Sequence, residues 1–121
     1  MPKTILIVED NALNMKMFND LLQAHGYKTL KSIDGGDIMA LVKEHRPDLI
    51  VMDIQLPGIS GLEITQMLKA DDEMKHIPVI AVTAFAMRGD EKTILEAGCD
   101  DYAAKPISVP IFLGKIANLL T

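Results

Sequence analysis

The sequence predicts a flavodoxin-like α/β fold, with helices on both faces of one parallel sheet. Short apolar segments alternate with segments of helical periodicity along the chain, and this alternation is typical of right-handed β-α-β units. The first, third and fourth strand segments are apolar throughout, whereas the second alternates and the fifth is short. Strands that are apolar on both faces belong in the centre of a sheet. The simplest strand order is therefore 2-1-3-4-5, with five helices in a three-layer sandwich.

The first strand is expected at residues 4–8, where β-branched and aliphatic residues run together. Asp10 or Asn11 can cap the following helix, and Gly26 provides its left-handed end. Five apolar residues of this helix recur at helical spacing and are expected to face the core. They are Leu13, Met17 and Leu21, with Phe18 and Leu22 beside them.

The second strand is expected at residues 28–32, where polar and apolar residues alternate as on a sheet edge. Asp34 is predicted to open a helix that buries Ile38, Leu41 and Val42 and ends at Arg46 and Pro47. The third strand follows at residues 48–53 and ends in a carboxylate.

The second half of the chain continues the alternation. Ser60 starts a capping-box pattern, and the helix after it runs through Leu68. A fourth strand is predicted at residues 78–83, a polar helix at 89–97 before Gly98, and a short strand at 101–105. Ser108 is expected to cap a last helix that buries three residues. These are Phe112, Ile116 and Leu120.

Length and charge exclude several classes of function. The 121 residues (13.3 kDa) are expected to form a single domain, residues 1–121, without a separate output domain. A net charge of −5 argues against nucleic acid as a partner. No apolar stretch approaches the about 18 residues of a membrane span, and the start does not resemble a signal peptide. We therefore expect a cytoplasmic protein without membrane insertion.

Polar side chains follow four of the predicted strands. Glu9 and Asp10 follow the first strand, Asp53 ends the third, Thr83 ends the fourth and Lys105 ends the fifth. In this strand order the switch point lies between strands one and three, and ligands bind above the carboxyl ends of the strands there. These residues are therefore the candidate functional site.

Three carboxylates at one switch point require a positive partner. Two carboxylates about 4 Å apart repel by about 4 kcal/mol at an effective dielectric constant near 20. Oxygen ligands with room for water and a phosphate oxygen favour Mg²⁺. We expect Asp10 and Asp53 to bind the ion directly and Glu9 to bind it through water. Asp53 can also attack phosphorus and form an acyl phosphate, for which Lys105 and Thr83 would supply a cation and a short hydrogen-bond donor.

Four segments resemble the CheY-like receiver domain of two-component response regulators: residues 8–11, 52–57, 83–84 and 105–106. The resemblance implies that Asp53 accepts a phosphoryl group and that Asp10, Asp53 and the Gln55 carbonyl hold Mg²⁺, with Glu9 acting through water. It also implies that Thr83 and Lys105 contact the phosphoryl group and that Tyr102 is a rotating switch. The acidic pair is Glu-Asp, where many receivers have Asp-Asp.

Further segments, including Asn14–Lys16 and His76–Pro78, are similar to single-domain cell-division regulators of the DivK type. The resemblance implies a signalling protein, not an enzyme with turnover, and we expect a monomer. Its partners would be sensor histidine kinases or histidine phosphotransfer proteins, which it would contact through the surface of the fourth and fifth strands and helices.

Two other functions stay open at this point. The first is a Mg²⁺-dependent phosphohydrolase that forms the same aspartyl phosphate. Such an enzyme needs a second acid near the nucleophile and a cap, but position 55 is Gln and the chain is short. The second is an adaptor that binds partners without phosphorylation.

Overall fold

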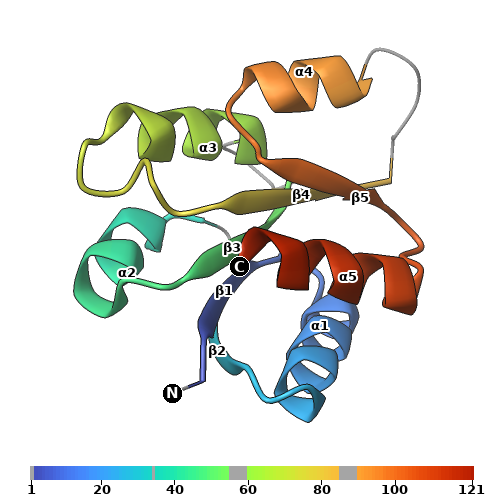
Figure 1. Cartoon of the computed structure of the whole chain (residues 1–121). Coiled ribbons are helices and arrows are strands. Elements are labelled where there is room, and N and C mark those ends of the chain that lie inside the picture. The colour runs from blue at the N-terminus through green and yellow to red at the C-terminus, as the bar shows by residue number, and fades with distance from the viewer. Residues whose placement is uncertain (1, 34, 55–59, 85–89) are drawn as a thin grey trace.

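The computed structural model describes residues 2–33, 35–54, 60–84 and 90–121. In this part of the chain five strands alternate with five helices (Figure 1). In chain order these elements are β1 (Thr4–Val8), α1 (Ala12–Ala24), β2 (Lys28–Ser32), α2 (Ile38–His45), β3 (Leu49–Asp53), α3 (Gly61–Ala70), β4 (Val79–Thr83), α4 (Asp90–Glu96), β5 (Asp101–Ala104) and α5 (Val109–Leu119).

The sheet confirms the predicted topology. Its order is β2-β1-β3-β4-β5, and every neighbouring pair is parallel. β1, β3 and β4 are buried almost throughout, whereas β2 and β5 are half-exposed edge strands. The apolar or alternating character of each strand therefore did predict its place in the sheet.

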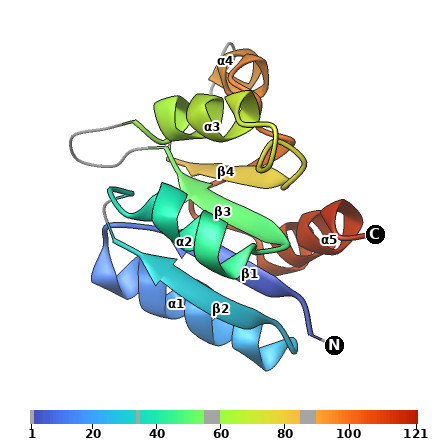
Figure 2. The same cartoon turned by 90° about the vertical axis from the view of Figure 1, so that its left-hand side faces the viewer.

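Helices cover both faces of the sheet (Figures 1 and 2). Side chains of α2, α3 and α4 pack on one face, together with alternate residues of the strands, such as Leu6 and Ala81. The other face is covered by α1 and α5, whose Phe18 and Phe112 rings lie 5.4 Å apart between centroids. The result is the expected three-layer sandwich.

The first turn of α1 is capped as predicted, but the buried face of this helix is not the predicted one. The Asn11 side chain accepts a hydrogen bond from the Asn14 N–H at 3.0 Å. Leu13 is 78% exposed and Met17 42% exposed, so the expectation that both face the core was wrong. The helix instead buries Met15, Phe18, Asn19 and Leu22.

Asn19 explains why the apolar pattern misplaced this face. Its Oδ1 accepts a hydrogen bond from the Thr29 hydroxyl of β2 at 2.6 Å, which satisfies a polar group in a position that is 8% exposed. Because one buried position of α1 is polar, the buried face of the helix differs from the face that its apolar residues alone indicate.

One other helix start and one predicted cap differ from the prediction. α2 begins at Ile38 rather than at Asp34, which lies outside the described residues. Gly35 has a positive φ of 80°, which a right-handed helix excludes, and its N–H donates to the Ser32 hydroxyl. Ser108 does occupy the N-cap of α5, but its side chain makes no capping hydrogen bond. Phe112 and Ile116 are buried as expected, while Leu120 is partly buried.

Candidate functional site

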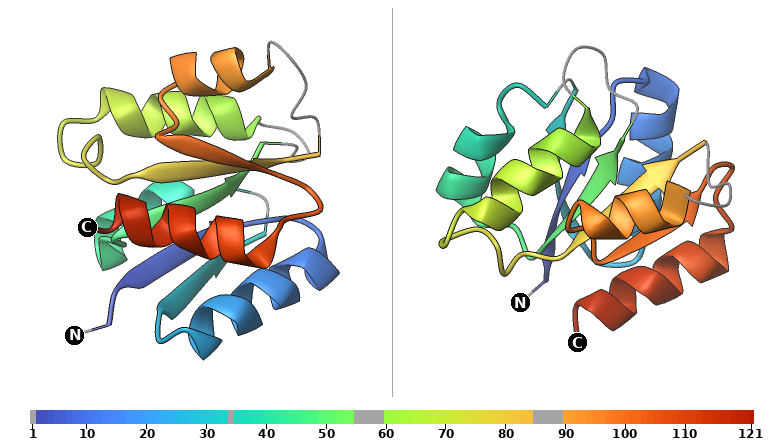
Figure 3. Two further views of the ribbon diagram at one scale, coloured as in Figure 1. Left: turned by 45° about the vertical axis from the view of Figure 1, so that its right-hand side comes forward. Right: turned by 90° about the horizontal axis from the view of Figure 1, so that it is seen from above.

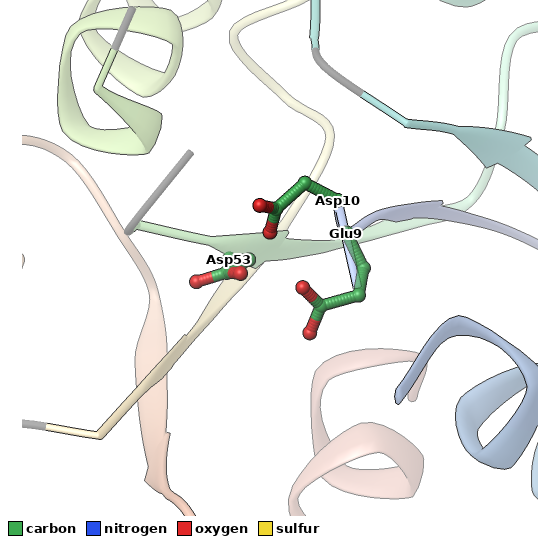
Figure 4. Close-up of side chains that lie close together, drawn as sticks. All are labelled: Glu9, Asp10 and Asp53. Carbon is green, nitrogen blue, oxygen red and sulfur yellow. The ribbon is translucent and has the colours of Figure 1, made fainter. Parts of the chain in front are cut away.

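The carboxylates of Glu9, Asp10 and Asp53 meet at the carboxyl ends of β1 and β3 (Figure 4). One oxygen from each residue lies within 4.8 Å of the others. Glu9 is 1% exposed and Asp53 3% exposed, whereas Asp10 is exposed. The cluster is thus two buried carboxylates with one open to solvent.

Asp53 is fixed by the backbone on both sides of it. It is the last residue of β3, where it is in register with Val82 of β4. The next residue, Ile54, donates its N–H to the Val82 carbonyl at 3.3 Å and accepts a hydrogen bond from the Gly61 N–H. Gly61 approaches so closely that a Cβ there would lie 2.4 Å from the Asp53 carbonyl oxygen. The start of α3 therefore holds the end of β3.

Lys105 brings a cation to this cluster from the end of β5. Its N–H donates to the Thr83 carbonyl at 2.7 Å, and the Lys105–Pro106 peptide bond is cis. The Lys105 ammonium lies 3.0 Å from Glu9 Oε1 and 3.4 Å from Asp53 Oδ2. The structure therefore joins four of the predicted site residues through carboxylates and one ammonium.

The electrostatics of the cluster follow from its burial. Burial, followed by the hydrogen bond with Asp53, raises the pKa of Glu9 to about 7, against the opposing effect of Lys105. Burial acts to lower the pKa of Lys105, but the Glu9 and Asp53 carboxylates outweigh it and raise that pKa. Lys105 is therefore a permanent cation beside two crowded acids.

These residues fit a divalent cation. When all three carboxylates are ionised, Lys105 offsets one negative charge and two remain. The ligands are oxygen atoms, which Mg²⁺ prefers, and the exposed Asp10 leaves one side of the cluster open to water. Gln55, the predicted source of a carbonyl ligand, lies outside the described residues.

The two predicted switch residues lie on the α3 and α4 side of the sheet. Thr83 ends β4, is fully buried and shares a face with Ala81 by strand alternation. Tyr102 of β5 is in register with Ala81 and packs against the same core cluster. The Tyr102 hydroxyl donates to the Glu91 carboxylate of α4.

The chain matches the family model for the response regulator receiver domain over residues 5–117. This chain belongs to the response regulator receiver family. The family is one of signalling domains, so the phosphohydrolase alternative is set aside.

Curated relatives include the polar-differentiation response regulator DivK of Brucella anthropi. It is 60% identical over 120 residues, which cover 99% of this chain and 98% of that protein. DivK of Brucella ovis is 58% identical over the same lengths. The chain is thus similar in sequence, and over nearly its full length, to regulators of the DivK type.

Solved receivers share the fold. A putative response regulator from Chloroflexus aurantiacus superposes with a TM-score of 0.94 at 28% identity, covering 99% of this chain and 98% of that one. The receiver domain of the sensor histidine kinase PA1611 from Pseudomonas aeruginosa has a TM-score of 0.90 at 32% identity with the same coverage, and its structure has a magnesium ion coordinated in the active site cleft. The predicted family and fold are both confirmed.

Sequence reasoning missed three residues that shape this end of the molecule. They are Gly61, which meets the Asp53 backbone, and Glu91 and Lys115, which contact Tyr102. Gly61 stands inside the capping pattern that was recognised, but nothing local shows how closely it approaches β3. In the sequence, Glu91 and Lys115 look like ordinary charged residues on the exposed faces of helices.

Proposed function

We propose that the protein is a phosphorylation-activated response regulator that accepts a phosphoryl group on Asp53. The observation that carries this proposal is the carboxylate cluster of Glu9, Asp10 and Asp53, with the Lys105 ammonium 3.4 Å from Asp53. A nucleophilic carboxylate, oxygen ligands and a fixed cation are the groups that phosphoryl transfer requires.

Each residue has a distinct task in this proposal. An Asp53 carboxylate oxygen attacks the phosphorus of the donor, and the donor keeps the electrons of the broken bond. Asp10 and Asp53, with Glu9 through water, would hold Mg²⁺, which would neutralise charge on the transferred oxygens. Lys105 pairs with a phosphoryl oxygen, and the Thr83 hydroxyl donates to another. Tyr102 then turns inward and changes the surface of β4, α4, β5 and α5.

The phosphodonor surface that we propose lies beside α1. A groove of about 430 Å³ runs between α1 and the start of α5, and Lys105 and Ala84 are part of its lining. Its wall includes Met17 and Val109, and the neighbouring Leu13 is exposed. An apolar groove that reaches a phosphoryl-accepting site suits the apolar helix face of a histidine kinase or phosphotransfer protein.

The likeness to DivK supports a role in cell division or polar differentiation. In the described residues no helix is both long and apolar enough to cross a bilayer. A cytoplasmic location, a monomeric state, a single-domain organisation and the absence of nucleic-acid binding stay predictions.

The direct test is incubation with Mg²⁺ and acetyl phosphate, followed by intact-mass measurement. We expect one phosphoryl group on the wild type and none on Asp53→Asn. Stoichiometric labelling of Asp53→Asn would contradict the assignment of the acceptor. Partners that bind the wild type and Asp53→Ala equally well, with and without acetyl phosphate, would instead favour the adaptor function.

The docking surface is tested by Met17→Glu, with Met67→Glu on α3 as the matched control. Both side chains are exposed, by 42% and 47%, but Met67 lies on the opposite side of the sheet. Met17→Glu should slow transfer from a histidine kinase that phosphorylates the wild type by about tenfold or more. Labelling by acetyl phosphate should not change. Equal rates of kinase transfer for both variants would contradict this surface.

A further inference from the structure

Tyr102 stands at the open edge of the sheet between two helices that lie on opposite faces. β5 is an edge strand, with α4 on one side and α5 on the other (Figure 3). The Tyr102 side chain belongs to the α4 face, since it packs with the core cluster of that face. It is nevertheless only half-buried, so the ring is not inserted into the core.

Each flanking helix contributes one charged residue to Tyr102. From α4, the Glu91 carboxylate accepts a hydrogen bond from the Tyr102 hydroxyl. From α5, the Lys115 ammonium lies 4.8 Å from the centroid of the Tyr102 ring, a cation–π contact. Lys115 therefore reaches around the edge strand from the far face of the sheet.

The position of Lys115 does not depend on the ring. Its ammonium donates to the Tyr102 carbonyl at 2.6 Å and lies 3.4 Å from Asp101 Oδ1. Asp101 Oδ1 in turn accepts the Tyr102 N–H at 2.8 Å. The Tyr102 carbonyl and the Asp101 carboxylate thus hold the Lys115 ammonium beside the ring. The bond to Glu91, in contrast, exists only while the hydroxyl points outward.

We propose that Glu91 and Lys115 hold Tyr102 in its outward position and thereby set the resting balance of the switch. The inference rests on the proposed function and adds to it the two residues that oppose activation. An inward turn of the ring toward Thr83 breaks the hydroxyl bond to Glu91 and the contact with Lys115. The phosphoryl group must supply the free energy of both losses.

Tyrosine titration tests whether the hydroxyl bond to Glu91 forms in solution. The Glu91 carboxylate raises the pKa of Tyr102, with burial and Asp101 adding to the effect. In a Tyr27→Phe background, ultraviolet absorbance reports Tyr102 alone among the two tyrosines. Glu91→Ala should lower this pKa. Glu96→Ala removes another exposed α4 carboxylate, which pairs with Lys92, and should leave it unchanged. Equal pKa values in both variants would overturn the proposal.

The effect on the switch is measured by the affinity for beryllium fluoride with Mg²⁺, a mimic of the phosphoryl group. Glu91→Ala and Lys115→Met should each bind it about threefold more tightly than the wild type. In each variant, one of the two contacts that Tyr102 loses on turning inward is already absent. Glu96→Ala should match the wild type. A lowered Tyr102 pKa with unchanged affinity would show that Glu91 has only a structural role, and would overturn the proposal.

The two measurements separate this inference from the proposed function. If the wild type shows no beryllium fluoride binding that depends on Asp53, the proposed phosphorylation site fails. If the wild type binds beryllium fluoride and the three variants bind it with equal affinity, only the proposal that Glu91 and Lys115 stabilise the outward Tyr102 is wrong. These variants are Glu91→Ala, Lys115→Met and Glu96→Ala.

Discussion

Glu9 is almost completely removed from solvent and lies beside a second buried acid, Asp53. Lys105 compensates only partly, because one ammonium serves both carboxylates. The pKa of Glu9, raised to about 7, means that below about pH 7 the folded state favours a protonated Glu9 in the absence of a metal ion. The residue thus costs stability whenever it is ionised, which binding of a divalent cation would offset.

Glu9→Gln should therefore stabilise the magnesium-free protein by about 1–2 kcal/mol near pH 8, where the wild-type side chain is ionised. As the pH falls through about 7, the wild type regains this stability because Glu9 takes up a proton, and the two proteins should converge near pH 5. Urea unfolding in the presence of a chelator measures the difference. A wild type that is the more stable of the two at pH 8 would contradict this electrostatic explanation.

At the scale of elements, glycine has opposite roles in two helices. Gly61 begins α3 against the Asp53 carbonyl and Ile54 Cα, at 2.4 and 2.7 Å from an added Cβ. Both neighbours are backbone atoms, which cannot rotate away. Gly114 lies in the interior of α5, is exposed and has no atom within 4 Å of an added Cβ.

Gly61→Ala should destabilise the protein by about 2 kcal/mol or more and slow labelling by acetyl phosphate, because the end of β3 must shift. Gly114→Ala should stabilise it by about 0.5–1 kcal/mol, because alanine restricts the unfolded chain and favours a helix. Thermal unfolding compares the two variants. Similar stability of Gly61→Ala and the wild type would show that α3 can move without cost.

Lys69, at the end of α3, forms hydrogen bonds with two loops. Its ammonium donates to the Ile77 carbonyl at 2.8 Å and to Asp100 Oδ2 at 2.9 Å. Asp100 Oδ2 also accepts the Val79 N–H at 2.8 Å. Lys69 therefore ties α3 to the segments that enter β4 and β5.

Lys69→Met keeps the aliphatic stem but removes these bonds, and should cost about 1–2 kcal/mol of unfolding free energy. Lys75→Met removes an exposed pair with Asp72 at 3.2 Å and should change stability by less than about 0.5 kcal/mol. Chemical denaturation of both variants checks the contrast. Equal losses of unfolding free energy in the two variants would mean that solvent screens the Lys69 contacts as strongly as the exposed Lys75–Asp72 pair.

At the scale of the whole molecule, the parallel sheet unites residues that are distant in sequence. Lys105 and Glu9 are separated by 96 positions, yet their charged groups lie 3.0 Å apart. Parallel strands place all their carboxyl ends at one edge of the sheet. The same sheet links the carboxylate cluster to the β5 edge of the molecule. Thr83 ends β4 next to the cluster, and Tyr102 lies on the neighbouring edge strand, β5.

Thr83→Ala removes the hydroxyl proposed to report phosphorylation across the sheet. Labelling of Asp53 by acetyl phosphate should remain, while the preference of a bound partner for the phosphorylated form should fall by about fivefold or more. Thr83→Ser restores the hydroxyl and should recover most of the preference. Partner affinities of the two forms measure this effect, and an unchanged preference in Thr83→Ala would exclude Thr83 from the coupling.

The sequence by itself determined the strand order, the layers and the family. Apolar runs show which strands are buried on both faces, and this places β1, β3 and β4 in the centre. It also indicated Glu9, Asp10, Asp53 and Lys105 as one site, because each follows a strand whose carboxyl end is at the same edge.

Only the tertiary structure decided which face of α1 is buried, how closely Gly61 meets β3, and which charges surround Tyr102. Asn19 is buried because Thr29 of another element satisfies it, and Lys115 meets the ring by reaching around an edge strand. Periodicity describes one segment at a time. Contacts between segments depend on how the layers dock, so no local pattern contains them.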